Sequence, residues 1–114
     1  YDWSTAKKAC PSGWHLPSKA EWEVLGNDSK KLKAKSGWNS NGNGTDEFGF
    51  SALPGGYGGS GGSFLDVGGR GYWWSANEYG SSYAYDRGMI YDDDYADWGS
   101  SDKSYLFSVR CVQD

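Results

Sequence analysis

The sequence has little that could span a membrane or hold a zinc ion. No apolar run reaches the roughly 18 residues that a transmembrane helix needs. There is one histidine, the two cysteines stand near opposite ends of the chain, and no C-x-x-C pair occurs, which excludes a Cys/His zinc site. Only three prolines accompany 18 glycines, a balance typical of a loop-rich domain and not of a helical bundle.

Positive charge is scarce in the second half of the chain. Residues 1–57 carry seven basic and six acidic groups, whereas residues 58–114 carry four basic and nine acidic groups. Because an acidic surface repels phosphate backbones, we expect no nucleic-acid partner, and the lack of an apolar span argues against direct membrane insertion. The length suits one domain, 1–114, and the start at Tyr1 without a methionine suggests a mature or excised piece of a longer protein.

The two cysteines leave two interpretations open. Cys10 and Cys111 are either two buried thiols or the two halves of one disulfide. A bridge would close a loop of about 100 residues and stabilise the fold by roughly 4.7 kcal/mol in the chain-entropy account. A small, loop-rich domain needs such support, so we expect an oxidising compartment.

Two short helices are predicted near the N-terminus. In residues 3–10 the pattern W-x-x-A-x-x-x-C places apolar side chains on one helical face. In residues 18–26 the pattern S-x-x-E forms a capping box, and a glycine ends the helix. Residues 29–38 are basic and begin as a helix. Their lysines are expected to form a solvated face: Lys30, Lys31, Lys33 and Lys35.

The middle of the chain is predicted to be loops and its last third an antiparallel sheet. Residues 39–47 are polar and residues 55–71 hold nine glycines, so both are predicted to be irregular. Short aromatic or β-branched runs separated by turn residues follow. These runs are expected to be strands: 72–75, 83–85, 89–91 and 105–112. Helices first and strands later make the fold class α+β.

Four segments of the chain together carry a family pattern. They are C-P-S-G-W-H-L-P-S from Cys10, G-F-S-A-L-P-G-G from Gly49, Y-W-W-S from Tyr72 and S-V-R-C-V from Ser108. With these segments the chain resembles the FISUMP family, the "major paralogous domain" of bacterial surface and secreted proteins. The first helix ending in Cys and the last strand holding its partner are similar to the C-type lectin-like superfold. The segment W-H-L-P-S-x-x-E-W also resembles formylglycine-generating (sulfatase-modifying) enzymes.

The resemblance implies features that the composition leaves open. It implies a C-type lectin-like fold with two N-terminal helices, a loop-rich middle, a twisted antiparallel sheet and adjacent termini. It implies a disulfide between Cys10 and Cys111, and a β-strand upstream of Tyr1. It also implies a bacterial extracellular or cell-surface location, as for surface lipoproteins and adhesins.

Catalysis is not expected from these residues. A formylglycine-generating activity would need thiols beyond the disulfide, and Cys10 and Cys111 are the only two. A Ser–His–Asp site would depend on His15 alone, which we interpret as a packed residue, and no G-x-S-x-G motif accompanies it. Carboxylates within residues 92–97 could be paired for glycoside hydrolysis, but clustered acids on a loop are more often solvated or cation-binding.

No cofactor is predicted except a candidate structural calcium ion. The loop 39–47 is dense in side-chain oxygens, and its candidate calcium ligands are Asn43, Asp46 and Glu47. The alternative is that the loop uses these oxygens to satisfy its own backbone in Asx-turns. The tripeptides E-P-N, Q-P-D and W-N-D of sugar-binding C-type lectins do not occur, so a sugar bound through calcium is not expected.

A binding face is predicted within residues 79–105. This stretch holds six of the nine tyrosines, six aspartates and Trp98, a composition similar to that of antibody paratopes. By resemblance to retroelement-diversified variable proteins of the same fold, the following residues are expected to face the ligand: Asp86, Gly88, Ile90, Asp92, Asp94, Tyr95, Asp97, Trp98 and Asp102. The alternative is that the evenly spaced tyrosines only pack on a sheet.

The sequence therefore predicts a non-catalytic extracellular binding or adhesion module with a protein or glycan ligand. A further hypothesis is that the binding face is a diversified variable region. Two alternatives stay open. One is a calcium-independent carbohydrate-binding module that uses exposed Trp73, Trp74 and Trp98 as platforms; the other is a degenerate relative of the formylglycine-generating enzymes.

Overall fold

A computed structural model describes residues 1–59 and 61–114 of the chain. Its helical segments are short: α1 (Trp3–Ala9), α2 (Lys19–Val24), α3 (Ser29–Leu32) and the 3-10 turn η1 (Asn39–Asn41). Its strands are β1 (Trp14–His15), β2 (Tyr57–Gly58), β3 (Phe64–Leu65), β4 (Arg70–Glu78), β5 (Tyr83–Ile90), β6 (Asp97–Asp102) and β7 (Val112–Gln113). The strands pair antiparallel within each sheet, which confirms the predicted α+β class.

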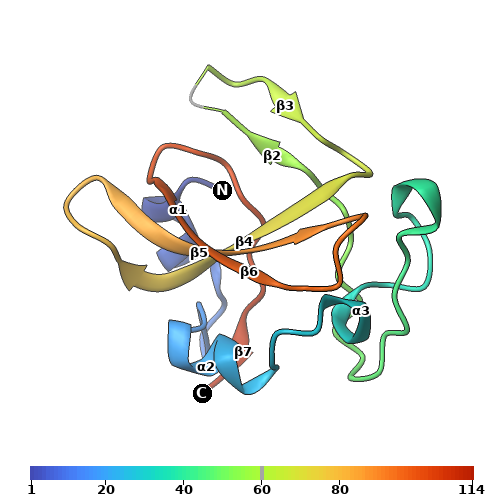
Figure 1. The fold of residues 1–114 in the computed structure, drawn as a ribbon. Helices are drawn as coiled ribbons and strands as arrows, with labels where there is room; N and C mark the ends of the chain where they lie inside the picture. The colour runs from blue at the N-terminus through green and yellow to red at the C-terminus, as the bar shows by residue number, and fades with distance from the viewer. Residues whose placement is uncertain (60) are drawn as a thin grey trace.

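The main sheet has the strand order β4–β5–β6 (Figure 1). Its register places Trp74 of β4 opposite Asp86 of β5, and Asp86 opposite Gly99 of β6. Two smaller sheets, β2–β3 and β1–β7, flank it. Figure 1 shows the β2–β3 hairpin beyond the β4 side of the main sheet and β7 beside α2.

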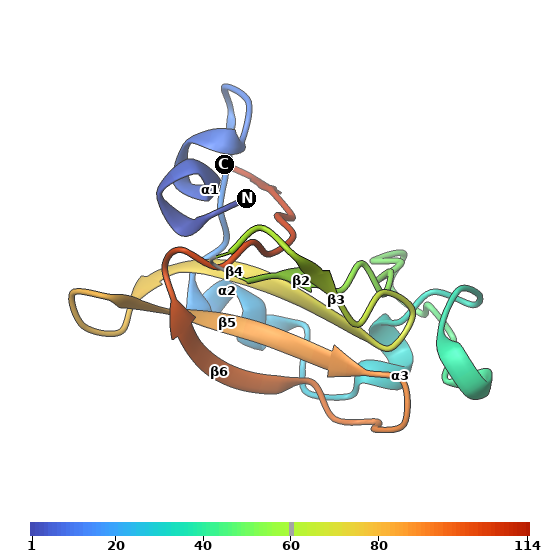
Figure 2. The ribbon, with the colours of Figure 1, turned by 90° about the horizontal axis from the view of Figure 1, so that it is seen from above.

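The main sheet separates two hydrophobic cores. Side chains alternate along a strand, so the neighbouring Trp73 and Trp74 point to opposite faces. Trp73 packs with Trp22 and Phe50, whereas Trp74 packs with Trp3. The face whose core includes Trp3 of α1 is here called the α1 face, and the face whose core includes Trp22 of α2 is called the α2 face. Figure 2 shows α1 and both chain ends beyond the β4 edge of the main sheet, with α2 behind the sheet.

The helices predicted at 3–10 and 18–26 are confirmed as α1 and α2. Ser18 Oγ accepts a hydrogen bond from Glu21 N, and the Glu21 carboxylate accepts one from Ser18 N, so the capping box is formed. Gly26 follows α2 with φ +79°, a left-handed conformation that glycine adopts without strain. In the described part of the chain, no helix is long and apolar enough to cross a membrane.

Lys33 contradicts the predicted solvated lysine face. The other three lysines of that segment are exposed, but Lys33 is only 1% exposed and follows a helix of four residues. Its Nζ donates to Asp93 O at 2.9 Å and lies 5.0 Å from the centre of the Trp38 ring. Burial lowers the pKa of Lys33, and nearby aspartates oppose that shift. The buried ammonium therefore ties α3 to the β5–β6 connection.

The extents of three predicted strands were wrong. One strand, β5, runs without a break where two were predicted at 83–85 and 89–91. The strand β6 was not predicted, because D-W-G-S-S-D is poor in strand-forming residues and is held by pairing with β5. Residues 105–112 are not a continuous strand; single bridges join Leu106 to Gly58 and Ser108 to Trp73 before β7 begins.

The two ends of the chain are joined covalently and by hydrogen bonds. Cys10 and Cys111 form a disulfide with an S–S distance of 2.08 Å, as the resemblance implied. The N-terminal amino group donates to Phe107 O, and the backbone N–H of Asp114 donates to Gly13 O, both at 2.9 Å. Both ends lie beyond the β4 edge of the main sheet (Figure 2).

Replacement of both Cys10 and Cys111 by serine is expected to lower the free energy of unfolding by about 2–5 kcal/mol, because the unfolded chain gains the freedom of an open loop. Guanidinium unfolding of the wild type, with and without a reductant, and of the double variant measures this change. Unfolding midpoints that do not respond to the reductant would contradict it.

Candidate functional site

The α1 face of the main sheet carries a cavity of about 250 Å³. Its walls come from β4, β5 and β6. The lining residues are Arg70, Tyr72, Asp86, Gly88, Ile90, Asp97, Trp98 and Gly99. This sheet-face cavity is smaller than the roughly 300–1,000 Å³ of pockets for drug-sized ligands, so it suits one functional group or the end of one side chain.

Asp86 is a buried carboxylate at this cavity. The residue is 3% exposed, and its Oδ2 accepts a hydrogen bond from Ser101 Oγ at 2.7 Å. Among the described residues, no cation lies within ion-pair distance of it. Burial raises the pKa of Asp86 to about 6, and the Ser101 hydrogen bond opposes that shift only in part. A buried charge without a partner cation is costly, so ionised Asp86 destabilises the fold.

Two glycines make room for the side chains that shape the cavity. A Cβ atom at Gly99 would lie 3.2 Å from Asp86 Oδ1, and one at Gly88 would lie 2.9 Å from the Tyr72 ring. Both distances are tighter than ordinary van der Waals contact. Larger residues at these positions would therefore displace the carboxylate or the phenol ring.

The charge that remains in the cavity is negative. Arg70 donates from Nη1 to Tyr72 OH at 3.1 Å, and its Nε lies 3.7 Å from Asp66 Oδ2. The positive charge of Arg70 is thus balanced locally. Asp86 and the exposed Asp97 contribute the charge that is left.

Five of the nine residues predicted to face a ligand meet at this cavity: Asp86, Gly88, Ile90, Asp97 and Trp98. Asp92, Asp94 and Tyr95 lie in the exposed connection between β5 and β6. Asp102 lies at the other end of β6, where its Oδ1 accepts hydrogen bonds from Ser104 N and Oγ. The structure thus brings the first five together and leaves Asp102 outside the cavity.

The three tryptophans considered as a sugar platform are poorly suited to that role. Trp73 is 5% exposed and Trp74 is fully buried. Trp98 is half-buried, and its ring packs against the Arg87 guanidinium at 4.8 Å. Exposed aromatic side chains lie elsewhere on the molecule, among them Trp14 and Phe48.

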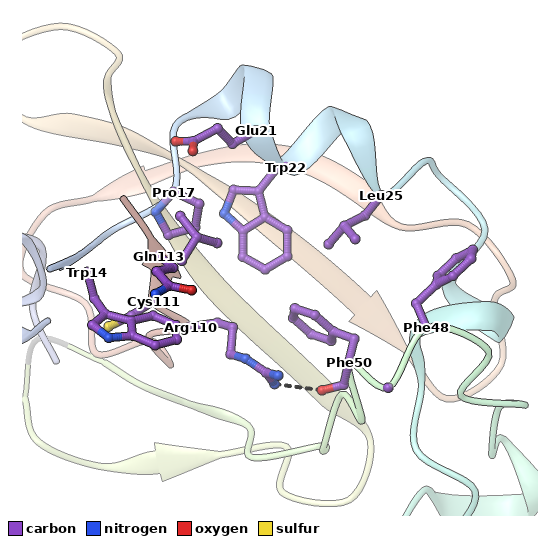
Figure 3. A pocket seen from close by; sticks show the side chains of 12 residues that line it. Trp14, Pro17, Glu21, Trp22, Leu25, Phe48, Phe50, Arg110, Cys111 and Gln113 are labelled. Carbon is purple, nitrogen blue, oxygen red and sulfur yellow. Dashed lines mark hydrogen bonds between the residues drawn. The ribbon is translucent and has the colours of Figure 1, made fainter.

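A groove of about 380 Å³ on the α2 face was missed by the sequence analysis (Figure 3). Figure 3 shows Trp14 at one end, Phe48 at the other, and Trp22 and Phe50 between them. The Arg110 side chain extends into the groove and donates to Phe50 O at 2.6 Å. No local pattern could indicate this aromatic groove, because its walls come from three segments that lie far apart in the sequence.

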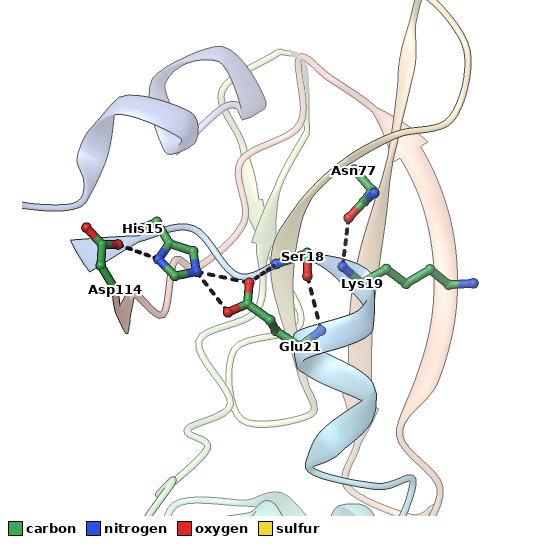
Figure 4. Close-up of polar contacts among 6 residues, drawn as sticks. All are labelled: His15, Ser18, Lys19, Glu21, Asn77 and Asp114. Carbon is green, nitrogen blue, oxygen red and sulfur yellow. Dashed lines mark hydrogen bonds and ion pairs between the residues drawn. The ribbon is translucent and has the colours of Figure 1, made fainter. Parts of the chain in front are cut away.

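His15 is not a packed residue, as was predicted, but links two carboxylates (Figure 4). Its Nδ1 lies 2.6 Å from Asp114 Oδ1, and its Nε2 lies 2.9 Å from Glu21 Oε2. The hydrogen bond with Asp114, followed by that with Glu21, raises the pKa of His15. The Ser18 backbone hydrogen bond, followed by that with His15, lowers the pKa of Glu21. Because both ring nitrogens are engaged, His15 links β1, α2 and the C-terminal residue.

The candidate calcium ligands are engaged within and beside their own loop. The backbone N–H of Trp38 donates to Asn43 Oδ1 at 2.9 Å, and Thr45 Oγ1 donates to Glu47 Oε2 at 3.2 Å. Ser51 donates from N and Oγ to the two oxygens of Asp46 at 2.8 and 2.6 Å. Within residues 1–59 and 61–114, no three His, Cys, Asp or Glu side chains gather as metal ligands. These hydrogen bonds match a loop whose side-chain oxygens satisfy its own polar groups.

The fold and these sites define a small, disulfide-closed α+β domain with a cavity on each face of its main sheet. The family model of the Fibrobacter succinogenes major domain matches residues 1–113. The chain belongs to this family, and the FISUMP resemblance is thereby confirmed. No curated protein and no solved structure matches the chain.

The His15 cluster is expected to stabilise the fold most at mildly acidic pH. Because the pKa of folded His15 is raised above 6.5, its contribution is complete below that pH and is lost as the pH rises through the folded value. Because the pKa of Glu21 is lowered from 4.5, its contribution is lost only under more acidic conditions. Melting temperatures of the wild type and His15→Gln should therefore differ most near pH 5–6 and converge toward pH 9. A difference that grows with pH would contradict this assignment.

Addition of calcium is expected to leave the melting temperature unchanged, because the loop oxygens are already hydrogen-bonded. A ligand that binds only the folded state raises the melting temperature in proportion to its occupancy. A thermal scan with millimolar calcium, matched against magnesium and a chelator, makes the measurement. A rise with calcium alone that Asp46→Asn removes would restore the calcium hypothesis.

Proposed function

We propose that the chain is a non-catalytic, extracellular binding module that holds a cationic group of a protein ligand in the sheet-face cavity. The observation that carries the proposal is Asp86, a buried carboxylate at a cavity and without a partner cation among the described residues. Residues that lower the stability of the fold and face a cavity are typical of ligand sites, where function keeps them in place. The ligand supplies the missing positive charge.

The chemistry around the cavity favours an amino or guanidino group. Asp86 and Asp97 offer carboxylate oxygens, while the balanced Arg70 does not oppose a cation. Hydrogen bonds between ionised partners are the stronger ones, and the cavity volume suits the end of a Lys or Arg side chain. The exposed Asp92 and Tyr95 lie in the connection between β5 and β6 and would contact the ligand around that anchor.

The choice of face draws on the expected C-type lectin-like fold, with which the order of the elements agrees. Helix α1 ends at Cys10, which is bonded to Cys111 near the end of the chain. The capped helix α2 follows, and the main sheet is formed late in the sequence. In the C-type lectin-like fold the C-terminal loops and strands form the binding face.

The proposal of a non-catalytic, exported protein draws on the cysteines and on the histidine. Both thiols are used in the disulfide, which leaves no free cysteine in the described part of the chain. Both nitrogens of His15 face carboxylates and not a hydroxyl nucleophile. A disulfide between the two ends of the chain is typical of proteins in oxidising, extracellular compartments.

Asp86→Asn is expected to raise the free energy of unfolding at pH 7.5 by about 1–3 kcal/mol. The folded-state pKa of about 6 lies above the ordinary 3.8, so the charged form is disfavoured in the fold and stability falls as the pH rises from about 4 to 6. An asparagine removes that cost and can still accept from Ser101 Oγ. Urea unfolding at pH 4 and 7.5 measures the difference, with the exposed Asp97→Asn as the control.

The same variant tests the function. Wild type, Asp86→Asn and Asp97→Asn are applied to protein and glycan arrays at pH 5 and pH 7.5. We expect the wild type to bind basic proteins more strongly at pH 7.5, where Asp86 is ionised, and Asp86→Asn to lose this binding although it is more stable. The absence of any protein ligand, or equal binding by Asp86→Asn, would refute the proposal.

A further inference from the structure

The aromatic groove on the α2 face holds a cation without a partner carboxylate. Arg110 is exposed, and its guanidinium lies 4.7 Å from the centre of the Phe50 ring while Nη1 donates to Phe50 O. Among the described residues, no carboxylate lies within ion-pair distance of it. The ring and the carbonyl oxygen fix the guanidinium and leave its other N–H groups available.

Two acidic residues in the surroundings of this guanidinium already accept hydrogen bonds from other groups. Glu21 at the rim of the groove accepts from Ser18 N and lies 2.9 Å from His15 Nε2. Asp46, close enough to sense the charge of Arg110, accepts two hydrogen bonds from Ser51. Arg110 is thus a cation in the groove whose remaining N–H groups are open to the carboxylate of an anionic occupant.

The rest of the groove suits a ring with hydroxyl groups. Trp14 is 44% exposed and Phe48 is 58% exposed, so two aromatic side chains offer open surface at its ends. The C–H face of a sugar ring packs on such surfaces. The exposed side chain of Gln113 also lines the groove and can both donate to and accept from hydroxyl groups. At about 380 Å³ the groove falls within the range of small-ligand pockets.

We propose that this groove is a second binding site, which takes a short saccharide whose rings carry carboxylates. Arg110 binds a carboxylate, Trp14 and Phe48 pack against rings at the two ends of the groove, and Gln113 binds a hydroxyl group. The site lies on the α2 face and shares no lining residue with the sheet-face cavity. It is therefore independent of the cationic ligand proposed there.

The experiment is a titration of the ¹⁵N-labelled protein with trigalacturonate and with the neutral galactotriose, followed by NMR shifts and calorimetry. We expect trigalacturonate to bind and to shift signals of residues 14, 48, 50 and 110–113, whereas galactotriose binds at least about tenfold more weakly. Arg110→Gln should weaken trigalacturonate binding by about tenfold or more, and Arg110→Lys by less, since it keeps the charge but not the planar fork.

Three variants separate the site from general charge and from the first site. Phe48→Ala removes an exposed ring that makes no hydrogen bond through its side chain, and should weaken binding several-fold without loss of folding. Lys8→Gln removes one positive charge from the exposed face of α1 and should leave binding unchanged. Asp86→Asn should also leave it unchanged, even if the first proposal fails.

Several results would overturn the inference. These are no binding of trigalacturonate, equal binding of both sugars, and equal loss in Lys8→Gln and Arg110→Gln. Shifts confined to the sheet-face cavity would overturn it as well. So would a peptide with a free C-terminal carboxylate that binds the groove when trigalacturonate does not.

Discussion

The fold depends on the burial of two neighbouring tryptophans that face opposite sides of one strand. Trp73 and Trp74 each enter a separate core, so the main sheet is held from both faces. The indole N–H of Trp74 donates to Tyr1 O at 2.9 Å, and that of Trp3 donates to Ser75 O at 2.8 Å. Helices of four to seven residues are not stable alone, so α1, α2 and α3 are stabilised by these large rings and not by their own length.

This arrangement leaves each face of the sheet with an unbalanced charge of opposite sign. Asp86 lies at the cavity of the α1 face, and Arg110 extends into the groove of the α2 face. Each is held by neutral groups, a serine hydroxyl in one case and a carbonyl oxygen in the other. A fold selected for stability alone would neutralise the buried charge of Asp86 or replace it with an apolar residue, whereas the exposed Arg110 costs the fold little. The proposal at Asp86 therefore follows from burial, and the proposal at Arg110 from its place among aromatic side chains.

Features encoded by short stretches of sequence could be predicted, whereas those set by long-range contacts could not. The capping box of Ser18 and Glu21 fixes α2 locally, and the family resemblance was enough for the disulfide. By contrast, β6 is a strand because its backbone pairs with that of β5, and the residue types of β6 do not indicate this pairing. His15 meets a carboxylate 99 residues away, and Lys33 meets a carbonyl oxygen 60 residues away.

The same difference between local and long-range features applies to the candidate site. The density of aspartate and tyrosine drew attention to β5 and β6, and alternation along β5 explains why Asp86, Gly88 and Ile90 share one face. The aromatic groove could not be predicted, because it exists only where residues from both ends and the middle of the chain meet.

The covalent link between the two ends also determines how the domain responds to mechanical force. Tension applied at the two ends of the chain passes through the Cys10–Cys111 bond, so residues 11–110 lie inside a closed loop that carries no load. In the described chain, α1 and the residues after Cys111 lie outside that loop and can be extended. A domain closed in this way would keep the sheet-face cavity and the aromatic groove intact while its two ends are pulled.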